Sequence, residues 1–219
     1  NNGISGKANF VYSLENNTKQ LGRFLAKASV SSVKEQVASA LHNVMSLTSA
    51  LFPEENCTPE QTACLQAAKG KEIDVPLHRL DAITSYMTHL KIHEQRNPLK
   101  NKQGAKLFKQ TGCNLRHTTT FTSKENNTIH PFSDFLLHDM GKALADNRSE
   151  FLATSQEWRT PPLWGAGLKK IIHEYSGYLH DGRAATLEEA ILWHAGEATQ
   201  VINKFKQLDA HKREQIINF

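Results

Sequence analysis

The sequence predicts an all-α protein that consists of a helical C-terminal domain and an N-terminal segment of helices and loops. Three observations favour this class. Apolar residues recur at helical spacing in several stretches, two of these stretches begin with a capping box, and no strand-like alternation of useful length occurs. Such a pattern indicates an architecture of helices packed on helices.

The length and charge of the chain limit how many domains it can form and which kinds of partner it suits. The 219 residues suffice for one substantial domain or two small ones. The formal net charge of +4 is spread along the chain, and no basic run is interleaved with aromatic residues, so nucleic acid is not favoured as a ligand. A weakly basic surface would suit an acidic redox partner protein. No apolar run approaches the roughly 18 residues that a membrane span needs.

The N-terminal segment contains two predicted helices. The sequence starts without an initiator Met, as in a mature or excised fragment, and residues 1–30 lack periodicity, so we expect loop or extended linker there. Ser32-x-x-Glu35 is a capping box, and helical apolar spacing continues to Met45. A second helix is expected with Asp74 as its cap and Pro76 as its first residue. Its apolar face would comprise Leu77, Leu80, Ile83, Met87 and Leu90.

A polar stretch over residues 93–103, broken at Pro98, is the best domain boundary in the sequence. It divides the chain into a linking segment of residues 1–97 and a C-terminal domain of residues 98–219. That domain would end in a helix that follows the capping box Thr186-x-x-Glu189. The apolar stripe of this helix would comprise Leu187, Ala190, Ile191, His194, Ala198, Val201 and Phe205.

Three cysteines leave one without an obvious partner. Cys57 and Cys64 are close enough in sequence to close a short loop as a disulfide, which would imply an oxidising compartment. Two unpaired thiols are the alternative. We favour the disulfide, because it leaves Cys113 as the single thiol with chemistry to do.

Cys113 lies in an almost complete haem attachment site. A c-type haem is held by Cys-x-x-Cys-His, in which two thiols bond to the porphyrin vinyl groups and the imidazole ligates iron. Cys113 and His117 match the first Cys and the His, but Arg116 occupies the position of the second Cys. A buried thiol beside a surface histidine would give the same residues.

His194 is a second candidate iron ligand, because its helical register turns it toward the core. A histidine that is hydrogen-bonded within helical packing would fit that position too. Together, His117 and His194 would provide the two axial ligands of a six-coordinate haem. His138 and Met140 are alternative distal ligands.

Three C-terminal segments are distinctive. They read Trp158-Arg-Thr-Pro-Pro-Leu-Trp, Tyr178-Leu-His-Asp-Gly-Arg-Ala and Thr186-Leu-Glu-Glu-Ala-Ile-Leu-Trp-His-Ala-Gly-Glu-Ala. In these segments the chain closely resembles the di-haem oxidoreductase family, also labelled thiol oxidoreductase, which is related to bacterial di-haem cytochrome c peroxidases and to the methylamine dehydrogenase maturation peroxidase. Upstream segments, from Gly3-Ile-Ser-Gly-Lys to Leu136-Leu-His-Asp-Met-Gly, are similar to the same family, so the resemblance covers nearly the whole chain.

The resemblance implies a cytochrome c-like C-terminal domain and a separate N-terminal haem domain that precedes this chain, which would be the C-terminal half of a longer protein. It also implies that His117 is the proximal ligand, and His194 the distal ligand, of the electron-entry haem. Arg159 and His180 lie in the matching motifs and are included among the candidate cofactor-binding residues. A calcium ion, held partly by backbone carbonyls, is implied at Tyr175 and Gly177.

Arg116 departs from the family pattern, and one thioether would be lost. Cys113 could still form one bond, and two histidines could still hold iron. We therefore expect a periplasmic electron-transfer domain with a bis-histidine haem c. With both axial positions filled, the fragment alone would not reduce peroxide. One alternative is a haemless pseudo-cytochrome domain that acts as a structural or binding module; another is thiol redox chemistry at Cys57 and Cys64.

Overall fold

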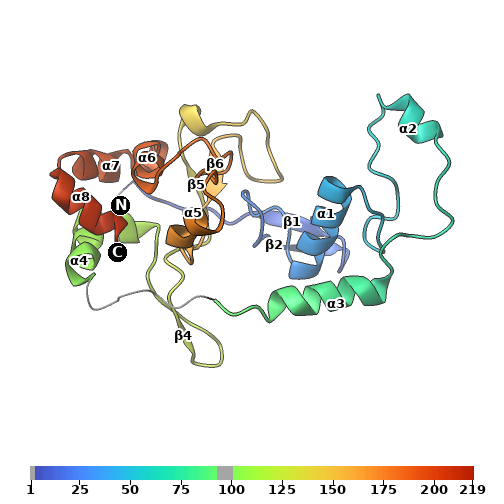
Figure 1. The fold of residues 1–219 in the computed structure, drawn as a ribbon, viewed down its shortest axis with the longest axis horizontal. Helices are drawn as coiled ribbons and strands as arrows, with labels where there is room; N and C mark the ends of the chain where they lie inside the picture. The colour runs from blue at the N-terminus through green and yellow to red at the C-terminus, as the bar shows by residue number, and fades with distance from the viewer. Residues whose placement is uncertain (1–2, 93–100) are drawn as a thin grey trace. The chain divides into compact units, whose positions relative to one another are not determined.

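The structure is a computed structural model that describes residues 3–92 and 101–219, which form two compact units (Figure 1). One unit comprises residues 10–91. The other combines the N-terminal residues up to Asn9 with Ile92–Phe219. The predicted domain boundary at residues 97 and 98 lies outside the described residues.

The unit of residues 10–91 contains one β-hairpin and three helices. The antiparallel strands β1 (Phe10–Ser13) and β2 (Thr18–Leu21) pair in a register that places Phe10 opposite Leu21. The helices are α1 (Val33–Met45), α2 (Thr62–Gln66) and α3 (Leu77–Thr88). A disulfide joins Cys57, which precedes α2, to Cys64 within α2, and this bond confirms the predicted pairing.

The helix α1 begins and ends as its sequence predicts. The Ser32 hydroxyl accepts a hydrogen bond from the Glu35 N–H at 3.1 Å, which satisfies one of the free donors at the helix start. The helix stops at Met45, where Ser46 adopts the left-handed conformation. Its inner face packs against α3 around a small core of four buried residues, namely Val37, Ala38, Val75 and Leu80.

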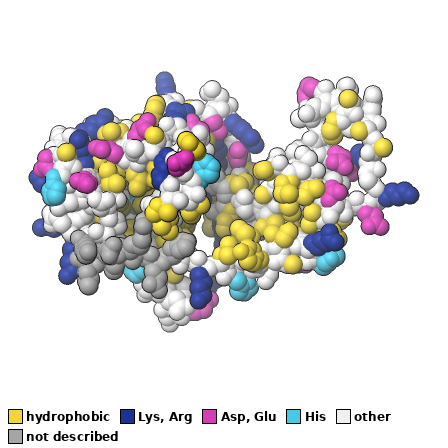
Figure 2. All heavy atoms as spheres, viewed as in Figure 1, with side chains coloured by type: hydrophobic (Ala, Val, Ile, Leu, Met, Phe, Trp, Pro, Cys, Tyr) yellow, Lys and Arg dark blue, Asp and Glu magenta, His cyan; other side chains and the backbone are white. Residues whose placement is uncertain are grey.

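The second predicted helix differs from expectation at its start and on its face. Asp74 does not cap α3, because its carboxylate accepts hydrogen bonds from the backbone N–H and hydroxyl of Thr48. Of the predicted apolar face only Leu80 is buried, and Met87 is 47 % exposed. The hairpin also exposes apolar side chains, and Figure 2 shows hydrophobic side chains gathered on the visible face of this unit. The unit therefore combines a small core with several exposed apolar side chains.

The second unit is built from short elements joined by long irregular connections. Its helices are α4 (Lys102–Thr111), α5 (Lys169–Ile172), α6 (Leu187–Leu192), α7 (Thr199–Lys206) and α8 (Ala210–Ile217). Its strands form two antiparallel pairs, β3 (Phe121–Thr122) with β4 (Thr128–Ile129) and β5 (Leu137–Asp139) with β6 (Glu157–Arg159). Single 3-10 turns at Cys113–Leu115, Lys142–Leu144, Ala166–Leu168 and Gly196–Ala198 complete the set.

The core of this unit lies where α4, α7 and α8 meet. Four buried residues form it, namely Leu107, Phe108, Phe205 and Ile216, with Cys113 and Phe132 packed against them. The helices α4 and α8 approach closely because residue 104 is glycine. A Cβ there would overlap the Gln215 carbonyl oxygen.

The predicted all-α class is wrong, because the described residues contain three two-stranded antiparallel sheets besides the helices, which makes the fold mixed. The strands are two to four residues long, too short for an alternation signal. In β1 the buried positions are Val11 and Ser13, so its inner face is only half apolar. The expected loop over residues 1–30 therefore contains the β1–β2 hairpin.

The predicted C-terminal helix after Thr186 is interrupted. It ends at Leu192, and α7 begins only at Thr199, after a turn in which Gly196 has a φ of 54°. His194 consequently lies in the connection between two helices rather than on a helical stripe. None of the described helices is both long and apolar enough to cross a lipid bilayer.

Candidate functional site

His117 is held by the tight turn that ends α4. Gly112 closes the helix with a φ of 102°, and the His117 N–H donates to the Cys113 carbonyl at 2.9 Å. The ring Nδ1 lies 2.8 Å from the Phe132 carbonyl oxygen. A carbonyl only accepts, so Nδ1 carries the proton and Nε2 keeps its lone pair.

Burial lowers the pKa of His117 to about 4, so the imidazole is neutral near pH 7. Its Nε2 has no hydrogen-bond partner among the described residues.

His194 has the same arrangement on a different element. Its Nδ1 lies 2.7 Å from the Ala190 carbonyl oxygen in α6, which leaves the Nε2 lone pair without a partner in the described part of the chain. Burial is the largest cause that lowers its pKa, the positive charge of Arg116 adds to this effect, and the resulting pKa is about 3. Cys113, four residues before His117, and Ile191, three residues before His194, pack against the same apolar cluster. Both histidines are neutral ligand-type imidazoles over the whole physiological pH range.

Arg116 lies beside this pair as a buried cation. Its side chain is 6 % exposed, and its Nη2 donates to the Met140 sulfur at 2.9 Å. The Nε and Nη1 atoms are buried without a hydrogen-bond partner among the described residues. Burial lowers the pKa of the guanidinium to about 10, while the charges of Asp134 and Glu197 oppose that shift. Arg116 therefore remains cationic at neutral pH, with donors left open.

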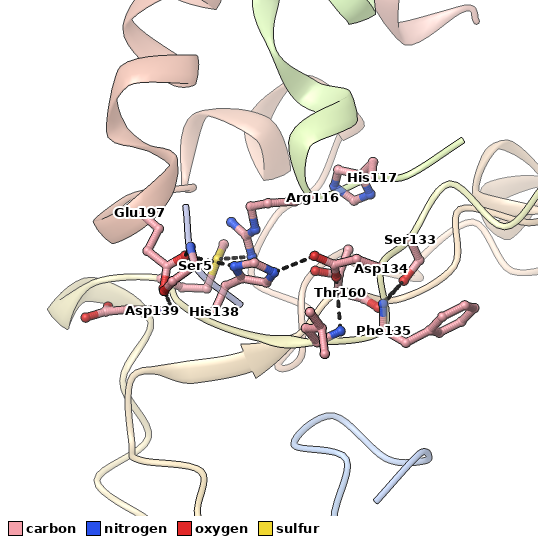
Figure 3. A network of polar contacts seen from close by, with 12 residues as sticks. Ser5, Arg116, His117, Ser133, Asp134, Phe135, His138, Asp139, Thr160 and Glu197 are labelled. Carbon is pink, nitrogen blue, oxygen red and sulfur yellow. Dashed lines mark hydrogen bonds and ion pairs between the residues drawn. The ribbon is translucent and has the colours of Figure 1, made fainter. Parts of the chain in front are cut away.

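His138 is engaged on both ring nitrogens, as Figure 3 shows. Its Nε2 lies 2.7 Å from Asp134 Oδ2, and its Nδ1 lies 2.8 Å from Glu197 Oε2. Burial raises the pKa of both carboxyls, but the hydrogen bonds from His138 outweigh that effect, and both pKa values are lowered. Two ionised carboxylates can only accept, so His138 donates from both nitrogens as an imidazolium.

The two alternative distal ligands are thus both occupied in this structure. His138 has no free lone pair, and Met140 accepts from Arg116. Glu197 also ties the N-terminal segment to the site, because its carboxylate accepts from the Ser5 N–H at 3.0 Å. Asp134, His138 and Glu197 therefore form a hydrogen-bonded cluster that joins segments distant in sequence.

Cys113 is a protonated thiol packed into the core. Burial raises its pKa to about 11, and its side chain contacts the apolar cluster around Phe108 and Phe205. A thiol in this state is a poor nucleophile near pH 7.

Arg159 and His180 lie on β6 and in the loop before α6. The His180 ring stacks on Trp158 with 3.5 Å between ring centroids. Burial lowers the pKa of the Arg159 guanidinium.

The residues implied for calcium do not fit that ion. The Gly177 carbonyl already accepts a hydrogen bond from the Lys169 ammonium, and Tyr175 is 82 % exposed. A cation such as Ca²⁺ needs six to eight oxygen ligands, and a nearby ammonium repels it. The described residues contain no group of three or more His, Cys, Asp or Glu that could hold a metal ion. A haem iron needs only two side-chain ligands, fewer than such a group contains.

Sequence reasoning missed Asp134, Glu197 and the buried state of Arg116. Asp134 stands four residues before His138, and Glu197 lies in a segment quoted for its family resemblance. Their shared contact with His138 joins positions 59 residues apart, so no local pattern could reveal it.

Two neutral imidazoles with unpartnered Nε2 atoms are the donor set of a haem protein with two axial histidines. A family model also connects the chain with haem proteins. The model described as di-haem oxidoreductase, putative peroxidase, matches residues 1–219, and the chain belongs to this family. Neither the curated proteins nor the solved structures gave a match.

Proposed function

We propose that this chain binds haem with its iron between His117 and His194 and that it transfers electrons within a di-haem oxidoreductase. The observation that carries the proposal is the matched state of the two imidazoles. Each has its Nδ1–H bound to a backbone carbonyl and its Nε2 lone pair without a partner among the described residues. Ligating histidines in proteins are oriented in this way.

The residues of the chain perform three tasks in this proposal. The Phe132 and Ala190 carbonyls fix the two imidazole rings, and burial keeps both rings neutral, so no proton competes for Nε2 near pH 7. A haem supplies reversible one-electron chemistry when it is bound. Because both axial positions would be filled by protein, the site favours electron transfer over the binding of peroxide.

The proposed partners are inferred from the family and from the number of imidazole pairs in the described residues. The family is di-haem, and the described residues contain one such imidazole pair. A second haem on another domain, and a redox partner protein, are therefore part of the proposal. The Cys57–Cys64 disulfide supports an oxidising compartment such as the periplasm. The alternative of thiol redox chemistry at Cys57 and Cys64 would require reversible reduction of their disulfide.

The test is the visible spectrum of the protein produced in a host that matures c-type cytochromes, and of apoprotein reconstituted with haemin. We expect a low-spin spectrum that is lost in His117→Ala and in His194→Ala. His211→Ala is the matched control, because His211 is exposed on α8. A colourless wild-type protein, or a low-spin spectrum that survives both substitutions, would contradict the proposal. A colourless protein would favour the haemless module.

A further inference from the structure

Arg116 is the one side chain at the site whose chemistry the proposed function does not use. Its guanidinium is buried, and two of its three nitrogens, Nε and Nη1, lack partners among the described residues. A buried donor without a partner is costly, and a charged one more so. An acceptor that is absent from the chain itself would satisfy it.

The nearby carboxylates do not supply that acceptor. Asp134 and Glu197 attract the guanidinium electrostatically, but one oxygen of each contacts His138 (Figure 3), and the other accepts from a backbone N–H. The remaining contact of Arg116 is the Met140 sulfur, a weak acceptor. The open donors therefore face a place where the chain offers no anion.

That place adjoins the His117 imidazole. Arg116 is next to His117 in sequence, and Figure 3 shows both side chains at the end of the same turn. A ligand held by the two Nε2 atoms would therefore have an edge close to the guanidinium.

A haem offers two different edges to a protein. Two vinyl groups lie on one edge and two propionate carboxylates on the opposite edge. Thiols bond to vinyl groups, whereas a guanidinium pairs with a carboxylate through charge-assisted hydrogen bonds. The turn of residues 113–117 presents a guanidinium at Arg116, and its thiol at Cys113 packs into the apolar cluster of α4 and α7.

We propose that Arg116 binds a haem propionate, that the propionate edge faces the turn of residues 113–117, and that the haem is held without a thioether bond. This inference rests on the proposed function. Cys113 then remains a free thiol, and the salt bridge at Arg116 replaces covalent attachment in fixing the porphyrin.

The experiment compares ferric haemin with its dimethyl ester, in which both propionates are neutral, on the full chain. We expect the ester to bind the wild-type apoprotein about 10- to 100-fold more weakly, as for loss of a hydrogen bond to a charged group. Arg116→Gln should weaken haemin binding by a similar factor and should bind haemin and its ester equally. Arg148→Gln, at an exposed arginine, is the matched control and should keep the full discrimination.

Two further readouts test the absence of a thioether. Acid-acetone should extract all the colour from protein matured in a cytochrome c-competent host, and Cys113→Ser should retain haem. Colour that stays with the polypeptide would overturn the inference, as would equal affinity of the wild type for haemin and its ester. The ester comparison needs no substitution, so it decides even if Arg116→Gln fails to fold. A wild-type protein that binds neither compound would overturn the proposed function itself.

Discussion

Glu35 and Arg116 are buried charged side chains, one in each compact unit, and the surrounding residues satisfy them to opposite extents. Glu35, in the unit of residues 10–91, is 2 % exposed and accepts hydrogen bonds from the Ser13 and Ser31 hydroxyls and from the Glu15 and Ser31 N–H groups. Arg116, in the other unit, is 6 % exposed and has two nitrogens without partners in the described structure. A saturated buried charge stabilises a fold, whereas an unsaturated one indicates a ligand.

Removing the Glu35 charge, which is fully hydrogen-bonded, should change stability more than any other substitution considered. Glu35→Gln should lower the stability of the unit of residues 10–91 by about 3 kcal/mol, because an amide group would meet donors that need an acceptor. Hydrogen exchange of the α1 amides is the measurement. Tryptophan fluorescence would not report on this unit, because Trp158, Trp164 and Trp193 all lie in the other one.

The control for this substitution is Glu54→Gln, which removes an exposed carboxylate paired with Lys69. It should leave the exchange rates unchanged, since exposed ion pairs contribute little. Equal effects of the two substitutions would show that the hydrogen bonds of Glu35 do not stabilise the unit.

The same comparison predicts a dependence on pH. Burial raises the pKa of Glu35, but hydrogen bonds from Ser31 and Ser13 outweigh it and lower the pKa from 4.5 to about 2. The unfolded chain then binds the proton more tightly than the folded one. The stabilisation is therefore complete above about pH 4.5 and is lost as the pH falls toward 2.

The pH-dependent stabilisation from Glu35 is at most about 3 kcal/mol, because each pKa unit corresponds to about 1.4 kcal/mol. Exchange or urea unfolding between pH 2 and pH 6 measures the effect. Glu35→Gln should flatten the curve over this range, and an equally steep curve in that variant would assign the acid sensitivity to other carboxyls.

Removing the Arg116 charge should raise the stability of the apoprotein, whereas removing the Glu35 charge should lower stability. Arg116→Leu removes two unpartnered buried donors and keeps apolar volume, so the apoprotein should become more stable by about 1 kcal/mol. Urea unfolding followed by tryptophan fluorescence measures this, since all three tryptophans share the unit of Arg116. Haemin affinity should fall in the same variant. If stability fell with affinity, Arg116 would be a structural residue like Glu35.

Sequence patterns predicted the parts of the molecule that depend on near neighbours. The N-caps Ser32 and Thr186, the end of α1 at Met45 and the Cys57–Cys64 disulfide are confirmed, because each involves residues within a few positions of one another. The short strands were missed, and β5 pairs with β6 across about 20 intervening positions. The burial of Arg116 and the position of His138 between two carboxylates depend on the whole fold, which no local spacing encodes.

The smallest expected effect concerns the stability of α6, the helix that orients His194, one of the two proposed iron ligands. The Thr186 hydroxyl accepts from the Glu189 N–H at 3.0 Å, and the Ala190 carbonyl that orients His194 lies in the same short helix. Thr186→Ala should lower stability by about 1 kcal/mol by tryptophan fluorescence in urea, whereas Thr186→Ser keeps the hydroxyl and should cost only a few tenths. Since the cap lies outside the imidazole pair, haem affinity should fall less than in His194→Ala. If serine and alanine behaved alike, the hydroxyl would not be the stabilising group, and the packing of α6 rather than its cap would position His194.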